Sequence, residues 1–80
     1  MRIGRIVSRN DGSTLELYCL LDGIDDETIT YRRLLLRGDQ SDPKGFLESP
    51  NVSRVLTRNY EFIESEDLTR KYVQGRGHFT

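Results

Sequence analysis

The 80-residue sequence contains one cysteine, one histidine, no tryptophan and no alanine. A single thiol cannot form an internal disulfide, which excludes a disulfide-stapled secreted scaffold and a metal site built on paired thiolates. No run approaches the roughly 18 consecutive apolar residues of a membrane span, and no apolar run follows the basic amino terminus as in a signal peptide. These absences predict a small cytoplasmic domain with no membrane partner.

The same scarcity bears on catalysis. The only imidazole, His78, lies in a glycine-rich segment near the carboxyl end, and Cys19 falls on the apolar side of a predicted strand. A histidine-dependent triad and a zinc site therefore both lack suitably placed partners. The acidic run 25–27 lacks the spaced oxygen ligands of a calcium loop, and no phosphate-binding glycine loop is present. We predict a protein that is not an enzyme, with no catalytic residues, cofactor or metal.

Charge is nearly balanced, with 12 Lys and Arg against 13 Asp and Glu and a net charge of −1. The signs are nevertheless segregated along the chain, because residues 10–28 hold six acids and no base, whereas 29–37 hold three arginines and no acid. Such blocks either pair across neighbouring antiparallel strands or gather arginines on one face as a docking patch. Arginine outnumbers lysine ten to two, which fits an interface but also fits a bias in genomic base composition.

Composition favours sheet over helix, because Ile, Val and Thr total 15 residues and Ala is absent. Gly4 is predicted to mark a bulge in the first strand, and the Asp-Gly pair in 10–13 predicts a tight hairpin turn. Strands are predicted over residues 2–9, 14–22, 28–37 and 60–63. In the second strand, alternation places Leu15, Leu17, Cys19 and Leu21 on the core face and Tyr18 and Leu20 outside.

Three later stretches complete the prediction. Residues 38–50 are rich in Gly, Asp, Ser and Pro, which indicates an exposed connection anchored by Phe46 and Leu47. Residues 51–57 have spacings that suit a helix or a strand, and their β-branched residues favour a strand. Ser65 and the two acids after it predict the start of a helix. That helix would turn Leu68, Tyr72 and Val73 toward the sheet.

Together these elements predict a mainly β, small α+β fold. We expect a three- to five-stranded antiparallel sheet, open or curled into a small β-barrel, with a short carboxy-terminal helix. Residues 1–74 would form one small domain, and residues 75–80 a flexible tail.

One combination of residues points to binding. Residues 34–36 are three leucines, apolar on both faces of a strand, which is typical of a central strand or of an outer face covered by a helix or a partner. Arginines lie beside this run. We therefore predict a non-enzymatic protein-interaction module, a small accessory or regulatory subunit, with self-association into a homo-oligomer as one form of docking. The predicted partner-binding residues are Tyr31, Arg32, Arg33, Leu34, Leu36, Arg54 and Arg58.

An alternative function uses the same residue types. A small barrel that presents tyrosine and arginine outward can stack on, and pair with, the bases of single-stranded RNA or DNA. The net charge of −1, with acidic stretches beside each basic one, favours a protein partner over nucleic acid.

Overall fold

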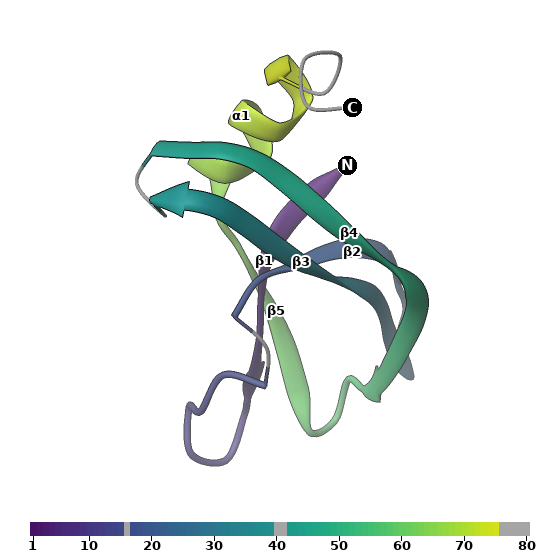
Figure 1. Cartoon of the computed structure of the whole chain (residues 1–80). Helices are drawn as coiled ribbons and strands as arrows, with labels where there is room; N and C mark the ends of the chain where they lie inside the picture. The colour runs from purple at the N-terminus through teal and green to yellow at the C-terminus, as the bar shows by residue number, and fades with distance from the viewer. Residues whose placement is uncertain (16, 40–41, 76–80) are drawn as a thin grey trace.

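The computed structural model describes residues 1–15, 17–39 and 42–75, which form one five-stranded antiparallel sheet and one helix (Figure 1). Neighbouring strands follow the order β4-β3-β2-β1-β5, and among the described residues no ladder joins β4 to β5. The predicted mainly β fold is confirmed, as an open sheet and not a closed barrel. Its elements are β1 (Arg2–Ser8), β2 (Cys19–Ile24), β3 (Thr28–Asp39), β4 (Asp42–Leu56), β5 (Tyr60–Glu64) and α1 (Glu66–Gly75).

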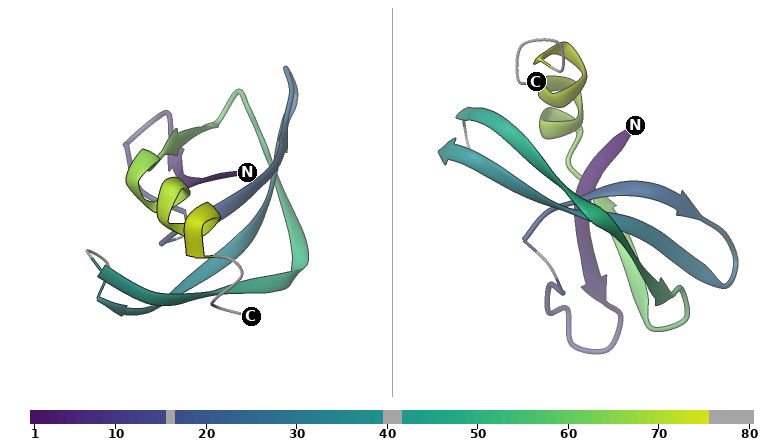
Figure 2. Two further views of the ribbon diagram at one scale, coloured as in Figure 1. Left: turned by 90° about the horizontal axis from the view of Figure 1, so that it is seen from above. Right: turned by 45° about the vertical axis from the view of Figure 1, so that its right-hand side comes forward.

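The sheet curls, so that one face closes on itself (Figure 2). β4 and β5 are opposite edges of the sheet, yet only the turn 57–59 connects them. Side chains from both edges reach a common cluster on this inner face, where burial from water supplies the main stabilisation. The inner cluster consists of Ile6, Cys19, Ile29 and Tyr31, with Leu21, Val55, Tyr60 and Phe62 packed against it.

The outer face is covered at one end by α1, which packs against β1 and the first half of β4 (Figure 2). The ring of Tyr72 meets that of Phe46 edge to face, with centroids 5.1 Å apart. The Tyr72 hydroxyl also donates a hydrogen bond to the Glu48 carboxylate. The outer cluster consists of Ile3, Leu20, Leu34, Leu68 and Tyr72, with Tyr18, Leu36 and Phe46 packed against it.

The helix begins where the sequence predicts, and hydrogen bonds fix its first turn to β1. The Ser65 hydroxyl accepts the Leu68 N–H at 3.3 Å, as in an N-cap. The Thr69 hydroxyl accepts the Ile3 N–H at 2.8 Å, and the Ser65 N–H donates to the Ile3 carbonyl at 2.7 Å. Val73 was expected to face the sheet, but it is 58% exposed. Leu68 and Tyr72, four residues apart, define the buried stripe, and the next residue points away from it.

The predicted strand 14–22 is wrong in its first half. β2 begins at Cys19, and Leu15 and Leu17 are 43% and 63% exposed. β1 pairs with β2 over only three residues, so among the described residues this ladder does not extend back over the preceding leucines. The turn itself forms, with Gly12 at φ +74° and an isolated bridge between Thr14 and Val7. Leu20 and Tyr18, expected outside, pack against the outer cluster because α1 covers that face.

The predicted connection 38–50 is also wrong, because most of it is the first half of β4. This strand pairs with β3 from Leu34↔Glu48 to Asp39↔Asp42. Its two prolines are tolerated because β4 is an edge strand. Phe46 packs as expected, but Leu47 is 59% exposed and anchors nothing. The strand interpretation of residues 51–57 is confirmed to Leu56, and the tail prediction falls mainly on residues 76–80, outside the described residues.

Gly4 marks a close approach between strands and not a bulge, since the register runs through it without a shift. A Cβ at this position would lie 2.1 Å from the Ile63 carbonyl oxygen. We expect Gly4→Ala to lower the free energy of unfolding by about 1–3 kcal/mol, because β1 and β5 must move apart. Urea unfolding measures the loss. Gly23→Ala is the control, because a Cβ there meets nothing within 4 Å; equal midpoints for both variants would contradict the prediction.

Candidate protein-binding surface

The structure divides the seven predicted partner-binding residues among separate environments. Tyr31 and Leu34 are 3% and 2% exposed and lie in the inner and outer clusters. Leu36 packs against the outer cluster beneath α1. These three residues therefore belong to the core, which corrects the prediction of a single surface patch.

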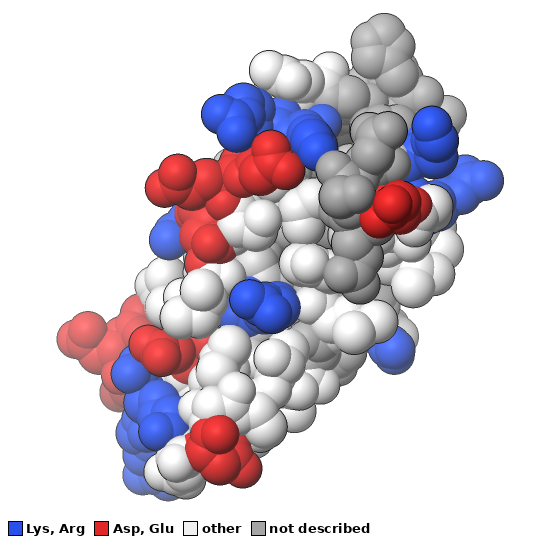
Figure 3. Space-filling model, turned by 90° about the vertical axis from the view of Figure 1, so that its left-hand side faces the viewer, with Lys and Arg blue, Asp and Glu red and all other residues white. Residues whose placement is uncertain are grey.

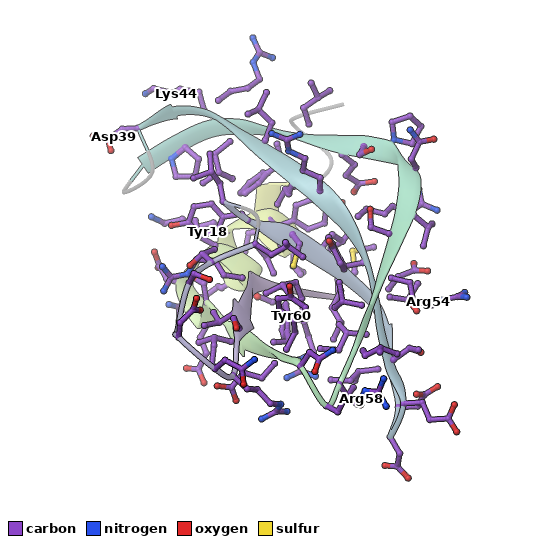
Figure 4. The ribbon with its side chains drawn as sticks, turned by 90° about the horizontal axis from the view of Figure 1, so that it is seen from below. Tyr18, Asp39, Lys44, Arg54, Arg58 and Tyr60 are labelled. Carbon is purple, nitrogen blue, oxygen red and sulfur yellow. The ribbon has the colours of Figure 1, made fainter. Side chains whose placement is uncertain are left out.

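The four predicted arginines lie near the surface but do not form one group. Arg32 is opposite Val52 and Arg54 is opposite Thr30, so the two arginines are diagonal neighbours on the uncovered end of the outer face. Arg33, one residue after Arg32, points to the inner face. Arg58 lies in the β4–β5 turn (Figure 4).

Beyond Arg33, the β3–β4 pair continues as a two-stranded arm. α1 covers the outer side of this arm. Its inner side is covered by no other strand or helix of the described chain, and there Leu35 lies directly opposite Leu47. The two leucines are 51% and 59% exposed. Alternation places Arg33 and Arg37 on the same side, two residues before and after Leu35.

An irregularity in β4 makes a hollow at the base of the arm. The register shifts between Arg32 and Leu34, so that three residues of β4, 49–51, lie opposite the single residue Arg33 of β3, and the Asn51 N–H donates to the Ser49 hydroxyl at 3.2 Å. The hollow has a volume of about 510 Å³. We name Arg33, Leu35, Arg37, Leu47 and Pro50 the arm surface.

Sequence reasoning found only Arg33 of this surface. It assigned residues 38–50 to a connection, so Leu47 had no strand partner. A signal was present in the three leucines 34–36. Once a helix covers the side chains of the first and third, the middle one must point to the other side.

The opposite end of β3 carries a compact acidic turn. Asp25 Oδ1 accepts the N–H groups of Thr28 and Glu27, both at 2.8 Å. These hydrogen bonds hold the pKa of Asp25 below its ordinary value, and Arg54 adds a smaller Coulombic contribution. The Thr57 hydroxyl donates to the Asp26 carbonyl at 2.6 Å, which ties the turn to the end of β4. We name the exposed residues Asp22, Ile24, Asp25, Asp26 and Glu27 the acidic tip.

The tyrosines are not arranged as a stacking platform. Tyr31 and Tyr72 are buried, and Tyr18 and Tyr60 pack against the clusters, Tyr60 within the curve of the sheet (Figure 4). Basic and acidic side chains are also interspersed over the face shown in Figure 3. The outward Tyr–Arg surface that motivated the nucleic-acid alternative is therefore absent from the described residues.

Other kinds of site find no candidate in the described part of the chain. No three His, Cys, Asp or Glu side chains gather there as a metal site. None of its helices combines the length and apolar character needed to cross a membrane. Comparison with protein families, curated proteins and solved structures gives no match, so the surface itself must support any function.

The hydrogen bonds of Asp25 predict an acid-dependent loss of stability. Because its folded pKa lies below the ordinary 3.8, its contribution is complete above that value and is lost as pH falls through the folded pKa. We expect Asp25→Ala to lower the melting temperature at pH 7 and to flatten the acid side of the stability profile. Asp25→Asn keeps a side-chain oxygen that can accept these hydrogen bonds, so its melting temperature should lie between those of Asp25→Ala and the wild type. Thermal unfolding from pH 2 to pH 7 measures both effects.

Asp26→Ala is the matched control for this experiment, since the Thr57 hydroxyl bonds to the backbone carbonyl of Asp26 and not to its carboxylate. Identical melting temperatures and acid profiles for Asp25→Ala and Asp26→Ala would show that the Asp25 side chain does not hold the turn.

Proposed function

We propose that the protein is a non-enzymatic binding module, a small accessory or regulatory subunit that docks a partner protein through the arm surface. The observation that carries this proposal is the opposed pair Leu35 and Leu47. Each is more than half exposed, on a side of the arm that no other described element covers. Covering the exposed parts of both leucines would contribute about 2–3 kcal/mol.

The charges beside the leucines support a protein ligand. Arg33 and Arg37 lie on either side of Leu35, and a planar guanidinium can bind a carboxylate through two parallel hydrogen bonds. An apolar side chain between acidic residues would therefore satisfy both parts of the surface. The single-stranded nucleic-acid alternative lacks support, because leucines and not aromatic rings occupy the centre of this surface.

Site-specific cross-linking tests the proposal. A photoreactive amino acid replaces Ser49, which lines the hollow, and in a second protein it replaces Val52, which is exposed on the outer face of the same strand. We expect a defined protein adduct in cells from position 49 and none from position 52. Leu35→Ser combined with Leu47→Ser should reduce the adduct at least about tenfold, since each lost leucine contact costs about 1 kcal/mol.

Val52→Ser combined with Leu56→Ser is the matched control, because it removes two exposed apolar side chains of β4 that lie outside the arm surface. The melting temperatures of both double variants are measured to confirm folding. An adduct that persists in the Leu35/Leu47 variant would refute docking through the arm surface. Binding of mixed-sequence oligonucleotides that Arg33→Ala abolishes would favour the nucleic-acid alternative instead.

A further inference from the structure

We infer that the uncovered end of the outer face binds a phosphate group between Arg32 and Arg54. This site lies on the opposite side of the sheet from the arm surface, so the inference goes beyond the proposed function and does not depend on it. Leu34 of β3 belongs to the outer cluster, and alternation places Arg32 on the same face. Val55 of β4 packs against the inner cluster, so its neighbour Arg54 points to the outer face (Figure 4).

The two arginines are close neighbours with no acid paired to either. Arg32 lies opposite Val52, and Arg54 lies opposite Thr30, so the arginines occupy one diagonal of a four-residue square. Residues on such a diagonal are about 7–8 Å apart, within reach of long side chains, and like charges there repel each other. None of the ion pairs among the described residues uses Arg32 or Arg54. Both guanidinium groups can therefore donate to one anion that lies between them.

Thr30 and Gly23 supply a further donor and the space for a ligand. Thr30 neighbours both arginines, because it precedes Arg32 by two residues on the same face and lies opposite Arg54. Gly23 pairs with Thr30 from the β2 side, and a Cβ at this glycine would meet nothing within 4 Å. A glycine within a strand allows a ligand to approach the backbone closely. An anion at this point can thus reach the Thr30 hydroxyl as well as the two guanidinium groups.

The number of donors favours phosphate over a carboxylate. One guanidinium donates two parallel hydrogen bonds and satisfies both oxygens of a carboxylate by itself. A phosphate monoester presents three oxygens and up to two negative charges, so it can bind two guanidinium groups and a hydroxyl together. We expect each arginine to bind phosphate oxygens from its own side and Thr30 to donate to another.

Two neighbouring acids weaken the site without occupying it. Arg54 makes a minor Coulombic contribution to the low pKa of Asp25, whose main cause is the hydrogen bonds of the turn. Asp22 is the extra residue at the irregularity of β2, directly before Gly23, and it is exposed. Each carboxylate reduces the positive potential at the site. We therefore expect a dissociation constant for phosphate in the millimolar range, and tighter binding in Asp22→Asn.

An NMR titration tests the inference. Inorganic phosphate is added to the ¹⁵N-labelled chain, and the amide resonances are followed against sodium chloride of the same ionic strength. We expect saturable shifts at Gly23, Thr30 and Arg32. Arg32→Ala and Arg54→Ala should each weaken binding at least about tenfold, because each removes charge-assisted hydrogen bonds. Thr30→Val keeps the shape of the side chain without its hydroxyl, and it should cause a smaller loss.

Arg5→Ala is the matched control, since it removes the same charge from an exposed arginine of β1, a strand that is not adjacent to β3. This variant should bind phosphate like the wild type. Shifts that do not saturate would overturn the inference. A loss of binding in Arg5→Ala as large as in Arg32→Ala would do the same, because it would show a response to net charge alone.

Phenyl phosphate in the same titration distinguishes an organic phosphate monoester from free phosphate. Val52 and Leu56 are exposed on either side of Arg54, on the same face, where they can contact an organic group. Tighter binding of phenyl phosphate that is lost in Val52→Ser combined with Leu56→Ser would assign a monoester, and equal affinities would assign free phosphate. Both results support the site. Binding of single-stranded DNA without binding of either phosphate compound would overturn it.

Discussion

β1 supplies Ile3 to one apolar cluster and Ile6 to the other, and these clusters lie on opposite faces of a single sheet. The described part of the chain forms one sheet, so no second sheet of these residues covers either face. One face is buried because the sheet curls until side chains of both edge strands meet. The other is buried because α1 is held against β1 by the bonds of Ser65 and Thr69 to Ile3. Each face is thus buried in a different way, the inner face by the curl of the sheet and the outer face by α1, and each of these buries only part of its face.

How far α1 and the curl of the sheet extend along the strands determines which apolar side chains remain exposed to solvent. α1 has 10 residues, about 15 Å of helix, whereas β3 has 12, about 40 Å of strand. The helix therefore covers only the arm end of the outer face and leaves Val52 and Leu56 exposed at the other end. The curl covers only the middle of the inner face and leaves Leu35 and Leu47 exposed on the arm. Of these two pairs, only the second adjoins the hollow made by the irregularity in β4, which is why the proposal centres on it.

The sequence predicted the features that depend on neighbouring residues and missed those that depend on distant ones. The Ser65 cap, the turn at Gly12 and the strand over 51–56 follow from local geometry. The alternation in 14–18 is equally regular, but only Thr14 and Leu15 of its described residues are bonded to β1, and Leu15 and Leu17 stay exposed. The exposure of Leu35 likewise depends on α1, which is some thirty residues away and covers the other side of the strand. Residue type alone could not separate the buried Tyr31 and Leu34 from a surface patch, because both kinds of position favour aromatic and apolar residues.

Charged residues of opposite sign are segregated along the chain. In some strands they pair across neighbouring antiparallel strands, and in others the arginines have no acid opposite them. Arg2 and Glu64 pair at 2.5 Å and Arg9 and Glu61 at 3.5 Å across β1 and β5, so the first basic block is answered by acids on the neighbouring strand. Such exposed pairs contribute little to stability. In β3, the residues in register with Arg32 and Arg37 are Val52 and Gly45, so neither of these two arginines has an acid directly opposite it on β4. β3 begins beside the acidic tip and carries these arginines farther along the strand. Acidic and basic residues that are separate in the sequence are therefore also separate in space, at different places along β3.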